Sequence, residues 1–392
     1  MISMSVGVGV GEDSFKAGVD ACQDAIAGLP NKRASLLLVF ASVSFDQDKL
    51  LEGINKTAEG ATVVGCSTAG EISSDGLSMV KTVVILAIET DQMKFHGASG
   101  QHLIWKPKDA GAKVAGDIQY QSSGYIKAAL LFLDVITGQG ESVLEGVTDG
   151  FGQTFPLFGA AAGDDELFYQ THQYLGNTVH TGSVVGLGLS GEFTLGYGIA
   201  HGFLPVGTSR VVTRSEGVLL HELDGKPAIE MYREYFGDEH SNALREGGLT
   251  GIAVSYPLGV TIPGKQGRIL RNPLFVNQKG SMTFTAAIQE GSEVRLMLSG
   301  KDEVIESAKQ AAERALAMLN GKKPKGIIVI DSIARKKLLG RNADDEVRTI
   351  QQVVGRDIPI VGFYSYAQVG GITEASDLPF HNSAILVLAL AE

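Results

Sequence analysis

The sequence predicts an α/β protein (mixed α+β) made of repeated β-α-β-β units, which form mixed sheets flanked by helices in two domains. Three observations favour this fold class. One pattern of apolar strand, helix, apolar strand and closing strand occurs three times along the chain. Its strands are almost continuously apolar, which is typical of parallel neighbours covered on both faces by helices. Finally, 50 glycines among 392 residues predict many tight turns and close backbone approaches.

The three units are recognised by their matching order and spacing. Each unit is expected to have a strand, a helix, a second strand and a closing strand, in that order. The first unit has them at 35–40, 48–59, 61–65 and 82–88, and the second unit at 128–134, 142–152, 155–159 and 182–189. The third unit has them at 326–331, 344–354, 358–362 and 383–390. The interval from Phe40 to Gly65 equals that from Asp134 to Gly159, and the third unit has a longer strand-to-helix loop. We expect the first two strands of each unit to be parallel and the closing strand to return antiparallel. The alternative is that any α/β chain produces such similarities.

Between the second and third units the pattern changes. Residues 209–222 predict a strand, a turn and a strand, 227–236 a short helix, and 268–298 several β segments. Residues 302–319 carry an apolar stripe at helical spacing, with Gly321 as the terminator. The boundary is best placed near His201, which predicts domains at 1–200 and 201–392.

Composition excludes several classes of protein. The net charge of −11 opposes nucleic-acid binding, and the short basic clusters at 322–325 and 335–337 are typical of solvated surfaces. No apolar run approaches the roughly 20 residues that span a bilayer, and residues 1–11 lack the features of a secretory signal. Only two cysteines occur, without disulfide or zinc spacing. We expect a cytoplasmic protein that binds neither membrane nor nucleic acid.

Catalytic motifs are incomplete. The segment 186–191 spells G-x-G-x-x-G, but it leads into a β-like stretch instead of a helix that could hold a pyrophosphate. The segment 65–70 misses the spacing of a nucleophile elbow by one residue. Cys66 follows a strand and could be a nucleophile, although a buried thiol is the simpler interpretation. An enzyme that uses Cys66 or Asp331 therefore stays an alternative to a binding protein.

Polar side chains cluster after the repeated strands. In open α/β sheets, ligands gather outside the carboxyl ends of parallel strands. An acid, an arginine and two tyrosines in such a crevice would suit a zwitterionic or anionic small molecule, whose carboxylate Arg335 could bind. The alternative is that these side chains cap helices and turns. The candidate ligand-binding residues are Ser67, Thr68, Glu71, Asp164, Asp331, Ser332, Arg335, Tyr364, Tyr366 and Gln368; Asp165 follows the same strand as Asp164.

Several ordered segments resemble the FIST sensory family, which has FIST N and FIST C domains. The resemblance extends from about Ala34 to Ala391, and it is carried by the segments 37–40, 64–71, 201–207, 222–228, 331–335, 362–366 and 380–382. Two departures concern the predicted site: the family commonly has cysteine where Ser332 stands, and a Gly-Glu pair where Ala367 and Gln368 stand.

The resemblance implies an intracellular sensor that binds an amino acid or a similar small molecule and regulates a separate signalling protein, such as a histidine kinase of a bacterial two-component system. One branch of the family is associated with haem and nitric oxide sensing. If haem is bound here, His381 or His201 is the first candidate for the iron ligand, because both flank turns within the resembling segments. The cofactor is otherwise unknown.

Overall fold

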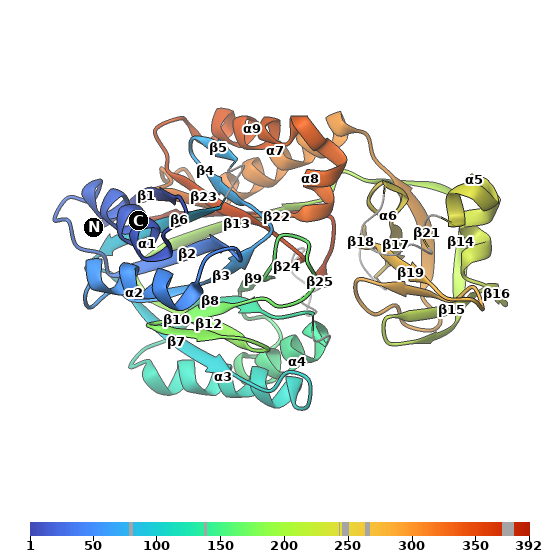
Figure 1. Cartoon of the computed structure of the whole chain (residues 1–392), viewed down its shortest axis with the longest axis horizontal. Coiled ribbons are helices and arrows are strands. Elements are labelled where there is room, and N and C mark those ends of the chain that lie inside the picture. Colours follow the sequence, from blue (N-terminus) through green and yellow to red (C-terminus); the bar gives the residue numbers. More distant parts are fainter. Residues whose placement is uncertain (78–80, 137–138, 243, 245–250, 263–266, 371–379) are drawn as a thin grey trace.

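The protein has a larger core lobe and a smaller lobe beside it (Figure 1). The computed structural model describes residues 1–77, 81–136, 139–242, 244, 251–262, 267–370 and 380–392. The small lobe comprises 204–298, and the core lobe combines the chain before it with the chain after it. Within the described part of the chain, every helix is too short or too polar to cross a membrane.

The core lobe contains the three predicted units, and the prediction of mixed sheets is confirmed. In each unit the second strand runs parallel to the first, and the closing strand pairs antiparallel with the first. The units consist of β2 (Leu36–Ser42), α2 (Gln47–Thr57), β3 (Thr62–Thr68) and β6 (Thr82–Thr90); of β8 (Ile126–Leu133), α4 (Gly140–Phe151), β9 (Leu157–Ala161) and β12 (Val184–Gly191); and of β22 (Gly326–Ser332), α9 (Asp344–Val354), β23 (Ile360–Ser365) and β26 (Ile385–Ala391).

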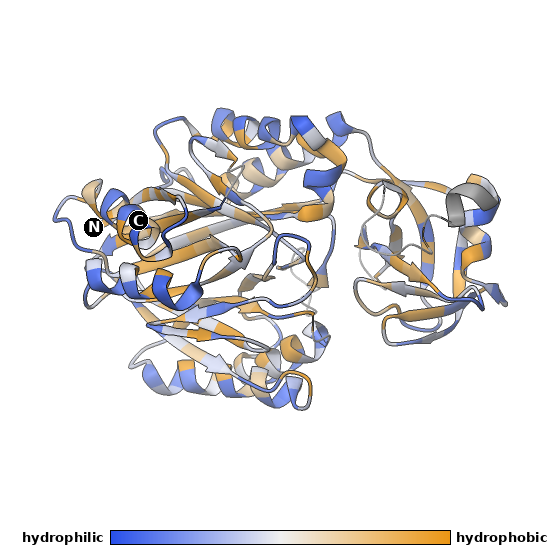
Figure 2. Cartoon of the chain, viewed as in Figure 1, coloured by the Kyte–Doolittle hydropathy of each residue, from blue (hydrophilic) through white to orange (hydrophobic). Residues whose placement is uncertain are grey.

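Each closing strand has a second antiparallel partner, and a helix covers each sheet. The partner strands are β1 (Ile2–Val10), β7 (Met93–Gly100) and β13 (Thr194–Ala200). The covering helices are α1 (Ser14–Ala27), α3 (Pro107–Gln121) and α7 (Lys301–Ala317). Helices α1 and α2 begin where Asp13 and Asp46 accept hydrogen bonds from backbone N–H groups of the first turn. Figure 2 shows the apolar strands inside and the polar helix faces outside.

The three units exchange short strands in a closed cycle. The second unit covers the free edge of β3, the third covers β9, and the first covers β23. The exchanged strands are β10 (Gln173–Leu175), β24 (Ala367–Val369) and β4 (Glu71–Ser73), each of which pairs antiparallel with a further short strand, β11 (Thr178–His180), β25 (Phe380–His381) or β5 (Gly76–Leu77). This cycle interlocks the units, so that none of them has a complete sheet of its own.

A shared apolar core lies where the three sheets meet. The ring of Phe40 stacks on that of Phe363 with centroids 4.4 Å apart, and Phe132 lies against both at 5.8 and 6.3 Å. Gly65 of β3 is needed because a Cβ there would lie 1.8 Å from the backbone oxygen of Val39. The equivalent glycines of β9 and β23 meet the same obstacle, which explains why glycine marks the repeat in the sequence.

The small lobe contains an eight-stranded antiparallel arrangement. Its strands are β14 (Leu204–Glu216), β15 (Leu219–Leu223), β16 (Lys226–Pro227), β17 (Leu258–Thr261), β18 (Arg268–Arg271), β19 (Pro273–Val276), β20 (Met282–Phe284) and β21 (Glu293–Leu298), and its helices are α5 (Ile229–Asn242) and α6 (Gly251–Ser255). The chain enters this lobe after β13 and leaves it before α7, so two neighbouring connections form a hinge. The remaining elements are α8 (Ile333–Leu339) and η2 (Gly340–Asn342).

Candidate functional site

The ten side chains predicted to bind a ligand all lie buried in the core lobe. They surround the ends of the parallel strands, as expected, but the space beyond those ends is filled by the exchanged strands. A ring of three backbone hydrogen bonds joins the units there. The N–H of Ala69 donates to Tyr364 O (2.9 Å), that of Tyr366 to Ala161 O (3.3 Å), and that of Gly163 to Ser67 O (3.0 Å).

Arg335 is held entirely by protein groups. Its Nε lies 2.9 Å from a carboxylate oxygen of Asp331, and its two terminal nitrogens donate to Glu346, Ser307 and backbone oxygens that include His201 O, at 3.1 Å. Asp331 and Glu346 share this one guanidinium, and burial raises the pKa of both carboxyl groups. Any ligand carboxylate at Arg335 would have to displace one of these partners.

Asp164 and Tyr366 form a second buried group. The carboxylate of Asp164 accepts hydrogen bonds from the N–H groups of Phe168, Tyr169 and Gln170 at 2.7–3.0 Å and from the Tyr366 hydroxyl. Tyr366 thus contacts the loop after β9, whereas Tyr364 lies beside the Arg335 network. The structure brings Asp331, Arg335 and Tyr364 together and does not bring Tyr366 into contact with them.

The other predicted residues also bond internally. Glu71 accepts hydrogen bonds from Thr68 (2.5 Å) and Thr82, and burial raises the pKa of its carboxyl group to about 7. Ser67 donates to Gly163 O (2.7 Å), Ser332 accepts from Ala334 N (3.3 Å), and Gln368 donates to Ser365 (2.8 Å) and accepts from Ala384 N (3.2 Å). Their role in ligand binding stays a prediction, and each of them has a structural task in this arrangement.

Cys66 has no exposed surface, and burial raises the pKa of its thiol well above the ordinary value. Burial therefore disfavours the ionised thiol that a catalytic cysteine would need. The side chain of Asp331 is 1% exposed and pairs with Arg335. Its carboxylate is therefore not accessible to a substrate.

An open cavity of about 620 Å³, here called the hinge cavity, lies where the chain crosses between the lobes. Ser299 donates a hydrogen bond to Gly202 O at 2.8 Å and so ties the two connecting segments together beside it. Its apolar wall is made of Ile199, Ala200, Phe203, Leu204, Ile262 and Ala384, and its polar lining includes His201, Arg268, Asp302, Glu303, Glu306, Gln310, Arg314 and His381. An apolar cavity with a few convergent polar groups is typical of small-ligand sites.

Charges of both signs line the hinge cavity. Arg314 donates to Ile199 O at 2.9 Å, and Arg268 has an Nε that lacks a hydrogen-bond partner among the described residues. The acids lie in the first turns of α7, and Glu306 is 3.5 Å from Lys309. Prediction from sequence missed these residues, because strand β18 meets helix α7 only through the tertiary fold. The helix and its charges were visible in the sequence, but nothing distinguished them from a solvated face.

His201 and His381, the two histidines singled out from the sequence, both line this cavity. The Nδ1 of His201 accepts a hydrogen bond from Phe203 N at 2.9 Å, and the imidazole also bonds to the backbone of Arg268. Burial, with the nearby positive charge of Arg335, lowers the pKa of His201 to about 4. The Nε2 of His381 is 3.1 Å from Gly370 O. Because the imidazoles are engaged with backbone groups, the arrangement does not fit ligation of a haem iron, and no cluster of three metal-ligating side chains occurs among the described residues.

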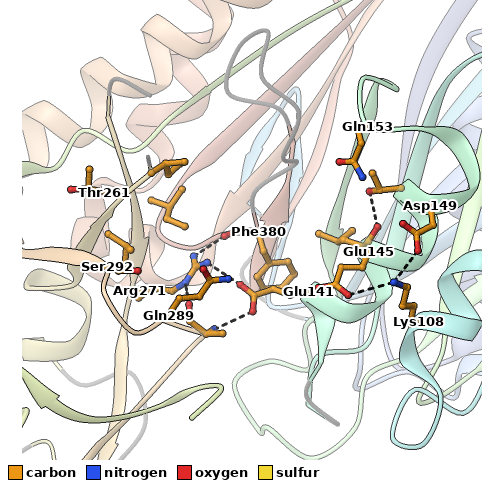
Figure 3. Close-up of a pocket in the computed structure, with 16 residues that line it drawn as sticks. Lys108, Glu141, Glu145, Asp149, Gln153, Thr261, Arg271, Gln289, Ser292 and Phe380 are labelled. Carbon is orange, nitrogen blue, oxygen red and sulfur yellow. Dashed lines mark hydrogen bonds and ion pairs between the residues drawn. The ribbon is translucent and has the colours of Figure 1, made fainter. Parts of the chain in front are cut away.

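A second opening of about 590 Å³, here called the interlobe groove, lies between helix α4 and the small lobe (Figure 3). The two openings share Ile262, and Phe380 lines the groove while its neighbour His381 lines the hinge cavity. Arg271 crosses the groove: it donates to Phe380 O at 2.7 Å and pairs with Glu141 of α4 at 3.1 Å. The side chain of Arg271 is buried, so this contact fastens the small lobe to the core lobe.

Two protein-family models match the chain. The model described as the FIST N domain matches residues 35–226, and the model described as the FIST C domain matches residues 228–370. Together they span most of the sequence and most of the residues that line the two openings; Phe380, His381 and Ala384 lie beyond the matched range. The domain boundary near residue 201 stays a prediction.

Relatives and solved structures show similarity to parts or all of the chain. An uncharacterized protein of Mycobacterium bovis is 26% identical over 389 residues, covering 94% of this chain and 95% of its own. One from Methanocaldococcus jannaschii is 29% identical over 224 residues, covering 53% of this chain and 41% of its own. Among solved structures, cyanuric acid hydrolase from A. caulinodans aligns over 100% of both chains, with 9% identity and a TM-score of 0.36. PurLQS from Thermotoga maritima aligns over 100% of this chain and 72% of its own, with 9% identity and a TM-score of 0.23.

Proposed function

The chain belongs to the FIST family, whose domains are associated with sensing in signal transduction, and from this premise we propose that it is a cytoplasmic sensor which binds an amino-acid-like molecule in the hinge cavity. One observation carries the proposal: the hinge cavity has positively and negatively charged side chains beside an apolar wall. The partner that receives the signal is a separate signalling protein, such as a histidine kinase.

The charge pattern suits a zwitterion. An α-carboxylate needs a guanidinium with unoccupied donors, and Arg268 supplies one: its buried Nε lacks a partner among the described residues, while its Nη2 makes a long contact of 3.5 Å with Glu293. An α-ammonium needs a carboxylate, and Glu303 and Glu306 line the same opening. His201 is neutral at pH 7, since its lowered pKa keeps the imidazole unprotonated. The ligand's side chain would then contact the apolar wall, which burial in a cavity favours.

The proposal is tested by calorimetric titration of the purified chain with the common amino acids and related zwitterions. Arg268→Gln should weaken the ligand that binds by about 1.5–3 kcal/mol, the usual contribution of a charge-assisted hydrogen bond. Arg348→Gln is the matched control, because Arg348 is 67% exposed on α9 and pairs only with its helix neighbour Asp345 among the described residues. If no zwitterion binds, or if Arg268→Gln retains the native affinity at equal stability, the hinge cavity is not the ligand site.

A further inference from the structure

The interlobe groove has an acidic wall with regular spacing. Glu141, Glu145 and Asp149 follow one another at intervals of four residues along α4, so the three positions lie in one row, about 6 Å apart along the helix axis on one face. Figure 3 shows Glu145 and Asp149 on the side opposite Thr261 and Ser292, with Phe380 between the two walls. The row is longer than a single amine or metal ion requires, and it matches cations that recur once per helical turn.

The charges of this wall are only partly balanced by the protein. Lys108 lies 2.9 Å from Asp149 but 4.0 Å from Glu145, and Arg271 is occupied by Glu141. Two described cations therefore serve three acids, and Glu145, with a side chain 64% exposed, is the least engaged of them. A ligand that brings positive charge therefore gains most at Glu145, and next to it Asp149 has to share Lys108 with Glu145.

The floor and the opposite wall of the groove are not acidic. Ile269 is partly exposed in the floor, and Leu144, Val260 and Phe380, which are largely buried, add small apolar areas from both lobes. Gln153, Gln289, Thr261 and Ser292 supply amides and hydroxyls that can hydrogen-bond a backbone or an amide side chain. A free cation would leave this apolar floor in water, whereas an amphipathic segment of a protein would cover it.

From this charge complementarity we propose that the interlobe groove docks a basic amphipathic segment of a partner protein, with arginine or lysine against Glu145 and Asp149 and apolar side chains on the floor. The proposal is independent of the hinge cavity, because the acidic wall lies in the core lobe on the other side of Ile262. Because the groove is lined by both lobes, a docked segment would contact the small lobe and the core lobe at once.

The probe is a fluorescein-labelled helical peptide with arginine at every fourth position and leucine beside each arginine, titrated against the full chain by fluorescence anisotropy. Glu145→Gln combined with Asp149→Asn should raise its Kd about tenfold at low ionic strength, since two exposed charge pairs are lost. Glu141 is left unchanged because it holds Arg271. The matched control combines Asp20→Asn with Asp117→Asn, which removes two exposed acids that likewise pair with lysines.

Weaker binding by the groove variant, with native affinity in the control and no binding of a peptide carrying glutamate for arginine, supports the proposal. Equal affinity of the groove variant and the native chain overturns it, as does a failure of the native chain to bind the peptide. Spermidine is titrated in parallel. If spermidine binds through the same two acids and the peptide does not bind, the groove takes a small polyamine and the proposal is wrong.

Discussion

Glu71→Gln should change how the stability of the core lobe depends on pH. The carboxyl group is 2% exposed, and burial raises its pKa from 4.5 to about 7, against the opposing effect of the hydrogen bonds from Thr68 and Thr82. Lys336 lowers the pKa and Asp165 raises it by smaller amounts. Since the folded pKa exceeds the unfolded one, folding favours the protonated acid. The associated stability is full below pH 4.5 and is lost as pH rises through 7.

The magnitude follows from the two pKa values. Between pH 5 and pH 8 the native chain should lose roughly 2–3 kcal/mol of unfolding free energy through Glu71 alone. The glutamine variant has no such loss, because its amide does not ionise, although exchange of a hydrogen-bond acceptor for a donor at one threonine adds a constant cost of about 1 kcal/mol. The sign of the pH dependence therefore separates ionisation from simple packing damage.

The assay is urea unfolding followed by circular dichroism at several pH values for the native chain, Glu71→Gln and the control Glu52→Gln, which is exposed on α2. The difference in stability between Glu71→Gln and the native chain should move in favour of the variant as pH rises, while Glu52→Gln follows the native curve. Parallel curves for Glu71→Gln and the native chain would refute the reasoning.

Three further expectations concern the core lobe. Gly65→Ala should destabilise it by about 3 kcal/mol or more, because the new Cβ would lie 1.8 Å from a backbone oxygen of β2, whereas Gly116→Ala, with nothing near its Cβ, should be neutral or slightly stabilising in urea unfolding. Arg335→Met should cost about 3–5 kcal/mol, since two buried carboxyl groups lose their cation; a loss below 1 kcal/mol would contradict the network. Cys66 should react with a thiol reagent only as fast as the chain unfolds, and rapid labelling of the native protein would show that the site opens.

The repeated units could be predicted because their signals are local. Their strands are buried on both faces, so the sequence shows nearly continuous apolar runs such as that of β26. The glycine inside the second strand of each unit is required by a backbone oxygen of the neighbouring strand. Helix α9 coincides with its predicted bounds, and Gly355, with a φ of 100°, explains where it ends. Patterns of this kind do not depend on distant parts of the chain.

The exchanged strands could not be predicted, because each has three residues and no periodicity that distinguishes it from a loop. Their pairing is decided by contacts between units far apart in sequence. The rule that ligands gather beyond parallel strands assumes an open crevice, and here the crevice is occupied by those strands. Asp331 and Tyr364 do lie near one another, as the sequence predicted, but they lie in a packed interior and not in an open crevice. Of the residues that line the hinge cavity, only His201 and His381 were candidates from the sequence, and they were candidates for a haem ligand.

Strands β18 and β25 contribute residues to both openings or to the contact between the lobes. Strand β18 carries Arg268 at the hinge cavity and Arg271 between the lobes, and β25 presents Phe380 to the groove and His381 to the cavity. Arg335 holds the backbone oxygen of His201 at the hinge itself. If the ligand and the groove's partner each bind more tightly to one separation of β18 and β25, each must change the affinity of the chain for the other by the same factor. A ligand that leaves this separation unaltered changes neither, however tightly it binds.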